Sequence, residues 1–463
     1  MQIKNKILVI VTATVTLITG CKKELDQQPI DFFGESNAYL TLADVQLGVN
    51  GAYGRYSAYG DEMYANALLS DEAKLGADNA GQGALTYRLQ FGSDATSGGD
   101  VTAAYYSHYS LIDQVNRVLP FISTVTAEPS QEPRRNILRG QLLALRAISH
   151  FSLLEGYADR YDPAKPGVAL MLASSVVGKP ARNTIGEVMT RIEQDLSEAK
   201  VLLQGTAATF TDTVMNEVNI AAYQARISLY KGDYQQAINY ATEVINFNLR
   251  PLVTSSNFNK IWTDSSNGEV LFRRRYSTGT NIGSLWTTTG NLVYIAPSDK
   301  LIASYSANDI RKNTFIGQNS SGNNYVKKFF TSSKGGRVVD IKAIRIAEMY
   351  LIRAESYAKL GNITLGAADL NTLRSLRIAN YITETFADGS ALLSAVLDER
   401  FKELAFEGFR FYDLKRNNLP LMRNASDANS DWQSLLANSF RWLLPLPSEE
   451  IIVNPNAKQN PGY

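Results

Sequence analysis

The stretch from Ile341 to Arg416 constrains the fold most, because it reads as consecutive amphipathic helices. Residues 341–360 repeat apolar side chains at helical spacing, and Arg and Glu take the other positions, which gives the first helix one apolar stripe. Gly361 ends it, and a second helix rich in small residues begins near Leu365. Two helices joined by a tight glycine turn are typical of a tetratricopeptide-like repeat, which cannot bury its apolar face alone. The pattern therefore predicts an array of such pairs.

A third helix is predicted over residues 392–416, where charged residues are threaded through apolar ones. Glu403 and Glu407 are four residues apart, a spacing at which like charges repel unless basic groups stand near them. Arg400 and Arg410 are the expected partners, and a helix that is apolar on most sides is expected to be buried. A catalytic carboxylate pair is the alternative, but no histidine lies nearby and arginine is interleaved throughout. We interpret the four residues as a structural ion-pair network.

A second repeat unit lies at residues 218–247, where small residues on two apolar stretches flank a Gly-Asp turn at 232–233. Thr184 and Glu187 are placed as the capping box of another helix. Further helices are predicted at 37–59, 105–119 and 138–151. Together these segments predict an all-α dominated fold with about four tetratricopeptide-like helix pairs and long irregular loop insertions.

The first 20 residues read as a lipoprotein signal peptide. Two lysines precede an apolar run at residues 7–18, which is shorter than the roughly 20 residues that span a bilayer. Cys21 follows small residues that suit a signal-peptidase cut, and it is the single cysteine of the 463 residues. We therefore predict Cys21 as a lipid attachment point, with no disulfide framework and no Cys-based metal site. A diacylglycerol thioether plus an amide-linked acyl chain would anchor the chain stably.

Two stretches lose helical periodicity and are rich in Gly, Ser and Asn, at residues 60–100 and 251–340. Ordered long loops on a rigid scaffold often carry binding groups. The 251–340 insertion also contains spaced aromatic residues, including Trp286 and Tyr294. Their rings suit stacking on the C–H faces of sugars, while short polar side chains suit the hydroxyls. The alternative is that these rings form a local core of the insertion.

Charge and histidine content exclude several classes of site. The net charge is +1 at pH 7, and the one short basic cluster at residues 273–275 is too small for a phosphate-binding face. His108 and His150 lack partners at metal-ligand spacing, so no metal and no cofactor are predicted. No Pro/Ser linker divides residues 21–463, which are expected to form one compact body.

Several motifs in one order also resemble a known family. RIAEMYLIRAESYAKLG, ADLNTLRSLR, DERFKELAFEGFRFYDLKR and the closing LLPLPSEEIIVNPNAKQNPGY are similar to the C-terminal half of the SusD/RagB family. YSHYSLIDQVNRVL and RGQLLALRAISHFSLLEGYADR resemble its N-terminal half. The resemblance implies a SusD-like fold, divided into a signal peptide (1–20), an N-terminal region (21–250), a loop-rich candidate ligand-binding lobe (251–340) and a C-terminal region (341–463).

The resemblance also implies a function. It implies a non-catalytic lipoprotein, anchored in the outer membrane and facing the cell surface, that captures glycan and delivers it to a SusC-like TonB-dependent transporter. Family members often place ligand contacts in the early loops, so Asp71 in SDEAK joins Trp286 and Tyr294 as a ligand-binding candidate. A peptide-capturing RagB-type member and a tetratricopeptide scaffold for protein partners stay open. A glycoside hydrolase is least favoured, since no separated acid/base pair is marked.

Overall fold

The computed structural model describes residues 38–56, 58–276, 282–288 and 291–463. The predicted signal peptide and Cys21 lie outside these residues. The longer helices are α4 (Leu42–Arg55), α5 (Ala58–Leu69), α7 (Ala95–Ile122), α8 (Glu132–Tyr157), α9 (Ile185–Leu202), α10 (Glu217–Lys231), α11 (Tyr234–Phe247), α15 (Ile346–Lys359), α16 (Ile363–Ser375) and α17 (Gly389–Glu403). The shorter ones are α6 (Ala84–Tyr87), α12 (Ser255–Trp262), α13 (Asp299–Ser304), α14 (Ile310–Phe315), α18 (Arg410–Arg416) and α19 (Ser448–Val453).

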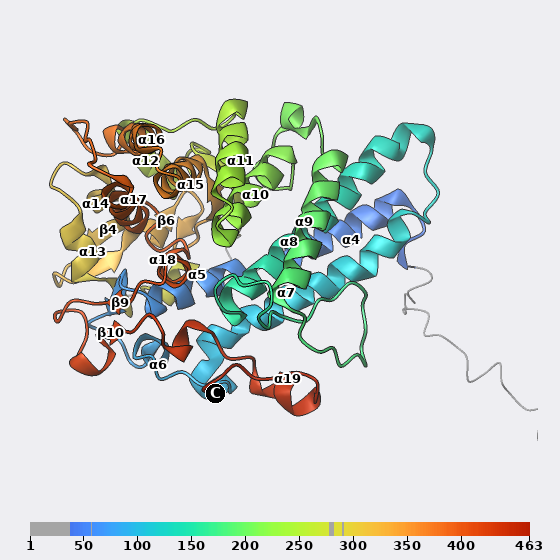
Figure 1. Cartoon of the computed structure of the whole chain (residues 1–463), viewed down its shortest axis with the longest axis horizontal. Coiled ribbons are helices and arrows are strands. Elements are labelled where there is room, and N and C mark those ends of the chain that lie inside the picture. Colours follow the sequence, from blue (N-terminus) through green and yellow to red (C-terminus); the bar gives the residue numbers. More distant parts are fainter. Residues whose placement is uncertain (1–37, 57, 277–281, 289–290) are drawn as a thin grey trace, which may run out of the picture.

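The long helices pack as neighbouring pairs, α4 on α7, α8 on α9, α10 on α11 and α15 on α16. Adjacent pairs also touch, through α7 with α8 and α11 with α15. Figure 1 shows the resulting array, which runs from α4 and α7 through α10 and α11 to α15 and α16. The predicted all-α dominated fold with about four helix pairs is therefore confirmed.

The local sequence explains how the pairs turn. Gly232 ends α10 in the left-handed conformation, with φ of 79°, and the Asp233 side chain caps α11 by accepting from the Gln236 amide. Ala225 and Ala237 are fully buried, as close helix approach requires. The predicted capping box of α9 is confirmed, because Thr184 and Glu187 each accept from the other's backbone amide.

The predicted bounds of two helices in the 341–416 stretch are wrong. Residues Ile341–Arg345 form strand β8, and the helix begins only at Ile346. The predicted single helix over 392–416 is broken between α17 and α18. Phe406 and Gly408 have φ of 65° and 88°, left-handed values that a right-handed helix cannot contain. Gly408 takes this value at little cost, and the chain turns here between α17 and α18.

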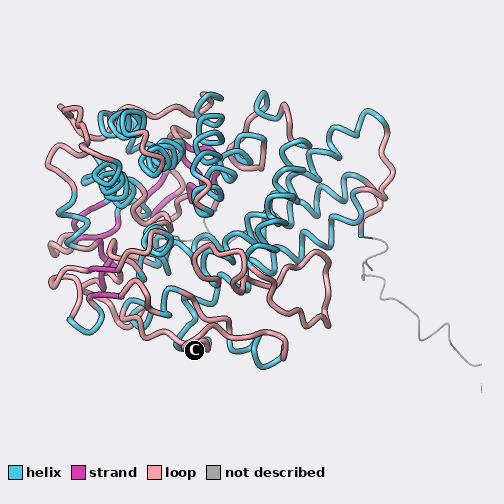
Figure 2. The backbone as a smooth tube through the Cα atoms, in the orientation of Figure 1, coloured by secondary structure: helices cyan, strands magenta, loops and turns pink. Residues whose placement is uncertain are grey.

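The described strands form five antiparallel two-stranded sheets. They are β1 (Ala73–Leu75) with β3 (Ile295–Pro297), β2 (Val270–Arg274) with β8, β4 (Ile316–Gln318) with β5 (Asn324–Val326), β6 (Thr331–Ser332) with β7 (Gly335–Gly336), and β9 (Leu421–Met422) with β10 (Ser434–Leu435). Figure 2 shows the strands in magenta, gathered at one end of the helical array among long loops.

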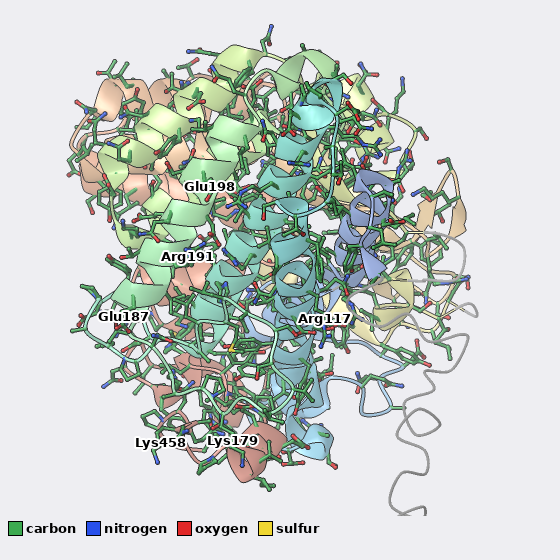
Figure 3. All side chains as sticks on the ribbon, turned by 90° about the vertical axis from the view of Figure 1, so that its right-hand side faces the viewer. Arg117, Lys179, Glu187, Arg191, Glu198 and Lys458 are labelled. Atoms are coloured by element: carbon green, nitrogen blue, oxygen red, sulfur yellow. The ribbon has the colours of Figure 1, made fainter. Side chains whose placement is uncertain are left out.

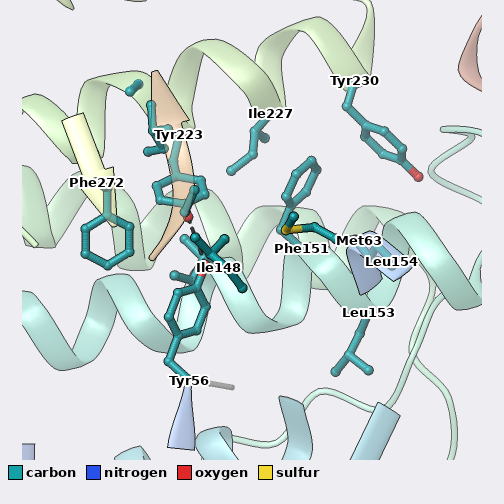
Figure 4. Close-up of a cluster of buried hydrophobic side chains, with 14 of the residues drawn as sticks. Tyr56, Met63, Ile148, Phe151, Leu153, Leu154, Tyr223, Ile227, Tyr230 and Phe272 are labelled. Carbon is teal, nitrogen blue, oxygen red and sulfur yellow. Dashed lines mark hydrogen bonds between the residues drawn. The ribbon is translucent and has the colours of Figure 1, made fainter. Parts of the chain in front are cut away.

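One large apolar core runs from α4 to the C-terminal segment. Where α8 meets α10 and β2, the side chains of Ile148, Phe151, Ile227 and Phe272 pack together (Figure 4). The Tyr56 and Tyr223 hydroxyls lie 3.1 Å apart in this cluster, so each buried hydroxyl has a partner. Buried residues of the 251–340 insertion belong to the same core. The loops of the insertion are therefore packed onto the same apolar core as the helices.

Candidate functional site

The loop at residues 70–83, between α5 and α6, is called the early loop, and it is joined to the insertion where β1 pairs with β3. Lys74 lies opposite Ala296 in the register, and the Gly76 amide donates to the Tyr294 carbonyl at 2.8 Å. A Cβ at position 76 would lie 2.1 Å from the Val293 carbonyl oxygen, so glycine is needed for this close approach. The pairing brings two segments that are far apart in sequence onto one surface.

Two polar side chains hold the early loop against the insertion. Asp78 accepts from the Val293 amide at 2.8 Å, and Asn79 donates to the Tyr294 carbonyl at 3.0 Å. The side-chain oxygen Oδ1 of Asn79 also accepts from the Gly81 amide at 2.9 Å, which fixes the turn. These bonds make the loop an ordered platform.

The β4–β5 hairpin extends the platform. Asn319 donates to the Asn291 carbonyl at 3.1 Å, which ties the hairpin to the 291–294 segment of the insertion. At the base of the hairpin the rings of Tyr325 and Phe330 lie 4.6 Å apart, and both are half-buried. The Arg337 guanidinium lies 5.8 Å from the Phe330 ring centroid. We call the surface made by residues 76–82, 291–294 and 316–326 the loop face.

The loop face combines aromatic rings with amide and carboxylate groups. Tyr294 and Tyr325 are half-buried, so part of each side chain is open to solvent. Asn291, Gln318 and Gln82 are exposed beside them. Rings with an apolar body and a polar tip, next to side-chain amides that both donate and accept, can bind a ligand with C–H faces and many hydroxyls.

Trp286 lies in the core, with 1% of its surface exposed. Its ring meets Tyr64 and Phe406 edge-on, with centroids at 5.7 and 5.5 Å, and it also contacts Phe329. This burial contradicts the predicted stacking role, because neither face of the ring is open to a sugar. The sequence signal was ambiguous, since aromatic residues of a loop insertion serve equally as its internal core.

Asp71 is buried as well, and it binds side chains of the protein. Arg410 donates to its carboxylate at 2.7 and 2.9 Å, and Lys300 donates at 2.6 Å. Burial alone would raise the pKa of Asp71, but Arg410 and Lys300 lower it to about 2. The predicted ligand contact is contradicted by this geometry, because both carboxylate oxygens are already bonded inside the protein.

Tyr294 is the predicted candidate that stays at the surface. Its backbone anchors the early loop, and its half-buried side chain lies on the loop face. Sequence reasoning included Tyr325 among the aromatic residues of the insertion, but it did not single out Asp78, Asn79 or Phe330. The available signals were the three glycines and one asparagine at 76–83 and the Asn-Tyr-Val strand of the hairpin.

The predicted ion-pair network is buried, but its pairing differs from expectation. Glu403 accepts from Arg311, Arg345 and Arg377 at 2.9 to 3.2 Å. Burial raises the pKa of Glu403, and the three guanidinium groups lower it far below its usual value. Lys328 and Arg345 bond Glu407 at 2.7 to 2.8 Å.

Arg400 and Arg410, the expected partners of these glutamates, bond elsewhere. Arg400 donates to Asp413 at 2.8 Å, and Arg410 donates to Asp71. The prediction assumed one continuous helix, but a new helix begins at Arg410 after the break at residues 404–409, and the Arg410 guanidinium lies over the Phe401 ring of α17 while it bonds Asp71. The network links α17 to the insertion and to β8, so its position is that of a structural element that holds these segments together.

Metal-ligating side chains do not cluster in the part of the chain that the structure describes. No group of three or more His, Cys, Asp or Glu residues there is arranged to hold a metal ion. The fold defines a helical-repeat scaffold protein that carries ordered loops on one surface.

Comparisons with known proteins agree with this class. Residues 273–463 match the model of the SusD family, and residues 38–229 match a SusD-like model described as starch-binding and associating with the outer membrane. The chain belongs to the SusD/RagB family. It shares the family's carbohydrate-binding fold, and the second model's description names the outer membrane.

Relatives match the chain along its whole length. SusD-like protein P2 of Formosa agariphila is 26% identical, over 98% of this chain and 99% of the relative. A Bacteroides vulgatus protein named for sugar binding has a solved structure with a TM-score of 0.80 and 26% identity, over 92% of this chain and 99% of that one. A SusD superfamily structure from Bacteroides thetaiotaomicron gives a TM-score of 0.80 at 24% identity, covering 91% of this chain and all of its own.

Within the described residues, every helix falls short of the length and apolar character needed to cross a membrane.

Proposed function

We propose that this protein is a non-catalytic surface lipoprotein that captures oligosaccharide on its loop face and delivers it to a SusC-like TonB-dependent transporter. The observation that carries the proposal is the joining of residues 76–82 to residues 291–294 on a rigid helical scaffold. A preorganised surface loses little conformational entropy when a flexible glycan binds.

The comparisons support the ligand class. The similar Bacteroides vulgatus protein is named for sugar binding, and one matching model is described as starch-binding. The half-buried rings of Tyr294 and Tyr325 are the stacking groups, and Asn291 and Gln318 are the hydroxyl-binding groups. Cys21 is the lipid attachment point that keeps the protein at the outer membrane.

Isothermal titration with oligosaccharides tests the ligand. Tyr294→Ala and Tyr325→Ala should each weaken binding by about 1 to 3 kcal/mol, the usual loss for a well-packed aromatic contact. Tyr240→Ala is the matched control, because Tyr240 is a half-buried ring on α11, away from the loop face. Equal affinities in all three variants would refute the loop face as the glycan site, and binding of peptides alone would favour the RagB-type alternative.

Co-purification tests the transporter. Mild detergent extraction of outer membranes should recover the protein together with a large β-barrel protein. Recovery of the chain without such a partner, at native expression levels, would argue for a scaffold or a free-standing binding protein.

A further inference from the structure

A groove of about 400 Å³ lies outside the loop face, between α7, the loop at residues 169–180 and α19. We call it the tyrosine groove, after Tyr105, Tyr106 and Tyr109, which line it from neighbouring turns of α7. Its volume is in the range of small-molecule sites, roughly 300 to 1,000 Å³. In Figure 1, α19 lies beneath α7, away from the β4 end of the molecule.

The tyrosines form a fixed aromatic wall. The rings of Tyr105 and Tyr109 are 4.7 Å apart, and those of Tyr105 and Tyr106 are 6.1 Å apart. The Tyr109 hydroxyl donates to the Ala169 carbonyl at 2.9 Å, and the Tyr106 hydroxyl donates to Glu449 at 2.9 Å. Tyr106 nevertheless has 47% of its surface exposed, so its ring is held in place while open to solvent.

Two carboxylates that can accept hydrogen bonds also line the tyrosine groove. One oxygen of Glu450 accepts from Asn454 at 2.7 Å, and its other oxygen has no partner among the residues that the structure describes. Glu450 and Tyr105 both line the groove, and burial first, and then the Glu450 carboxylate, raise the pKa of Tyr105. Asp113 also lines the groove, and its two oxygens keep free lone pairs beyond their bonds to Ser174 and Arg117.

The outer wall is an exposed apolar loop. Val176 and Val177 are 89% and 87% exposed, although valine gains free energy when it is covered. The loop is held at its far end, where the Asn456 side chain donates to the Lys179 carbonyl and that of Asn454 donates to the Pro180 carbonyl. Figure 3 shows Lys179 close to Lys458 of the C-terminal segment.

We propose that the tyrosine groove is a second carbohydrate-binding site, which takes a short oligosaccharide. A sugar C–H face stacks on the exposed Tyr106 ring, and hydroxyls donate to Glu450 and Asp113. Val176 and Val177 cover the opposite face of the sugar. A purely apolar partner is disfavoured, because its docking would bury both carboxylates without donors.

The site is distinct from the loop face, since the two surfaces share no residue. Two sites on one chain would hold a long glycan at two points, and the second contact would form at a raised effective concentration. The inference therefore stands whether or not the loop face binds, and the two are tested by different variants.

The test is isothermal titration of the full chain in detergent with a panel of α- and β-linked hexasaccharides of glucose, xylose and mannose. Tyr106→Ala should weaken binding at one class of site tenfold or more, and Tyr106→Phe should leave it within about twofold because the ring remains. Ala173→Trp fills the groove from an exposed position, so it should abolish the same binding without lowering the melting temperature. Tyr294→Ala, on the loop face, should leave the groove titration unchanged.

Four results would overturn the proposal. The first is an unchanged titration of every panel member by both Tyr106→Ala and Ala173→Trp. The second is equal loss in Tyr106→Phe and Tyr106→Ala, which would show that the hydroxyl and not the ring is recognised. The third is failure of the wild-type chain to bind any panel member at millimolar concentration. The fourth is loss of all binding by Tyr294→Ala alone, which would show that the protein has a single site. A Tyr294→Ala variant that binds every panel member as the wild type does would count against the loop face only.

Discussion

The Arg410 guanidinium donates two hydrogen bonds to the Asp71 carboxylate, at 2.7 and 2.9 Å, and so links α18 to the start of the early loop. Lys300, which follows β3, donates to the same carboxylate at 2.6 Å. One buried anion thus joins three segments that sequence places far apart. The loop face is built directly onto this junction, because β1 follows Asp71 by two residues.

Asp71→Asn should therefore destabilise the protein. Breaking a buried ion pair costs about 3 to 5 kcal/mol, and the lower end applies here because Arg410 and Lys300 are partly exposed and can be rehydrated. Urea unfolding at pH 7 measures this loss. A variant with the wild-type midpoint would show that the junction contributes nothing to stability.

The same residue gives a pH dependence. Burial raises the pKa of Asp71, but Arg410 and Lys300 bring it to about 2, below the ordinary value of 3.8. A carboxyl whose pKa is lowered on folding stabilises the native state above its unfolded pKa, and that stability is lost as the pH falls from about 4 toward 2. The stability gap between wild type and Asp71→Asn should accordingly narrow over this window.

Glu403→Gln should be more damaging than a surface change of the same kind. It removes the anion that faces Arg311, Arg345 and Arg377, all with 1% or less of their side chains exposed. Breaking a buried ion pair costs about 3 to 5 kcal/mol, and the lower end applies here because each arginine keeps another carboxylate, Glu399 for Arg311 and Glu269 for Arg345 and Arg377. Glu384→Gln is the matched control, since its side chain is 51% exposed and pairs with Arg374, which predicts a loss of about 0 to 1 kcal/mol. Similar melting temperatures for the two variants would contradict the structural role of the network.

Sequence periodicity predicted the scaffold because each helix pair is defined locally. The Gly232 turn, the small residues around it and the capping box at Thr184 are all set within a few residues, and each was found where expected. Residues 404–409 show the limit of this reasoning. Their apolar content continues the helical pattern, yet Phe406 takes a left-handed conformation that only the surrounding tertiary contacts can maintain.

The candidate site was less predictable, because burial of a loop residue depends on distant segments. Trp286 and Tyr294 are indistinguishable by sequence context, but Trp286 meets Tyr64 and Phe406 in the core while Tyr294 lies at the surface. The carboxylate of Asp71 likewise finds Arg410, a partner that no local spacing indicates. Which side chains pair across long sequence separations could not be predicted from the sequence.

Glu72→Gln should stabilise the protein, and increasingly so at higher pH. Glu72 is fully buried, and burial raises its pKa from 4.5 to about 8, with the Phe406 amide and Lys328 offsetting only part of the cost. For a carboxyl whose pKa is raised on folding, the contribution to stability is complete below the unfolded pKa and is lost as the pH rises from 4.5 toward 8. Glutamine is never ionised, so the variant avoids this loss.

The expected gain is on the order of a few kcal/mol at pH 8 and close to zero at pH 4.5. Urea midpoints measured across this range would show it. Glu132→Gln, on the exposed start of α8, should follow the wild-type curve. A stability difference for Glu72→Gln that stays constant with pH would show that Glu72 does not titrate on folding.

Cys21→Ala should release the protein from the membrane without changing its fold. The predicted lipid on Cys21 is the proposed sole anchor, and two or more acyl chains are what stable attachment requires. Membrane fractionation in high salt, with metabolic labelling by a radioactive fatty acid, checks both parts. Continued sedimentation of the variant with membranes, or label in the variant, would argue against Cys21 as the attachment point.

Gly76→Ala tests the junction of the early loop with the insertion. The added Cβ would lie 2.1 Å from the Val293 carbonyl oxygen and 2.9 Å from the Tyr294 carbonyl carbon, so one of the two backbones has to move. We expect a loss of about 1 to 3 kcal/mol, as for other overpacked positions, together with weaker oligosaccharide binding, because the displaced strand carries Tyr294. Gly54→Ala is the matched control: a Cβ there meets no atom within 4 Å, and alanine in a helix should be neutral or add roughly 0.5 to 1 kcal/mol. Thermal unfolding and titration of both variants separate the effects, and a Gly76→Ala protein with wild-type melting and wild-type affinity would show that the close approach of the two loops does not matter for either.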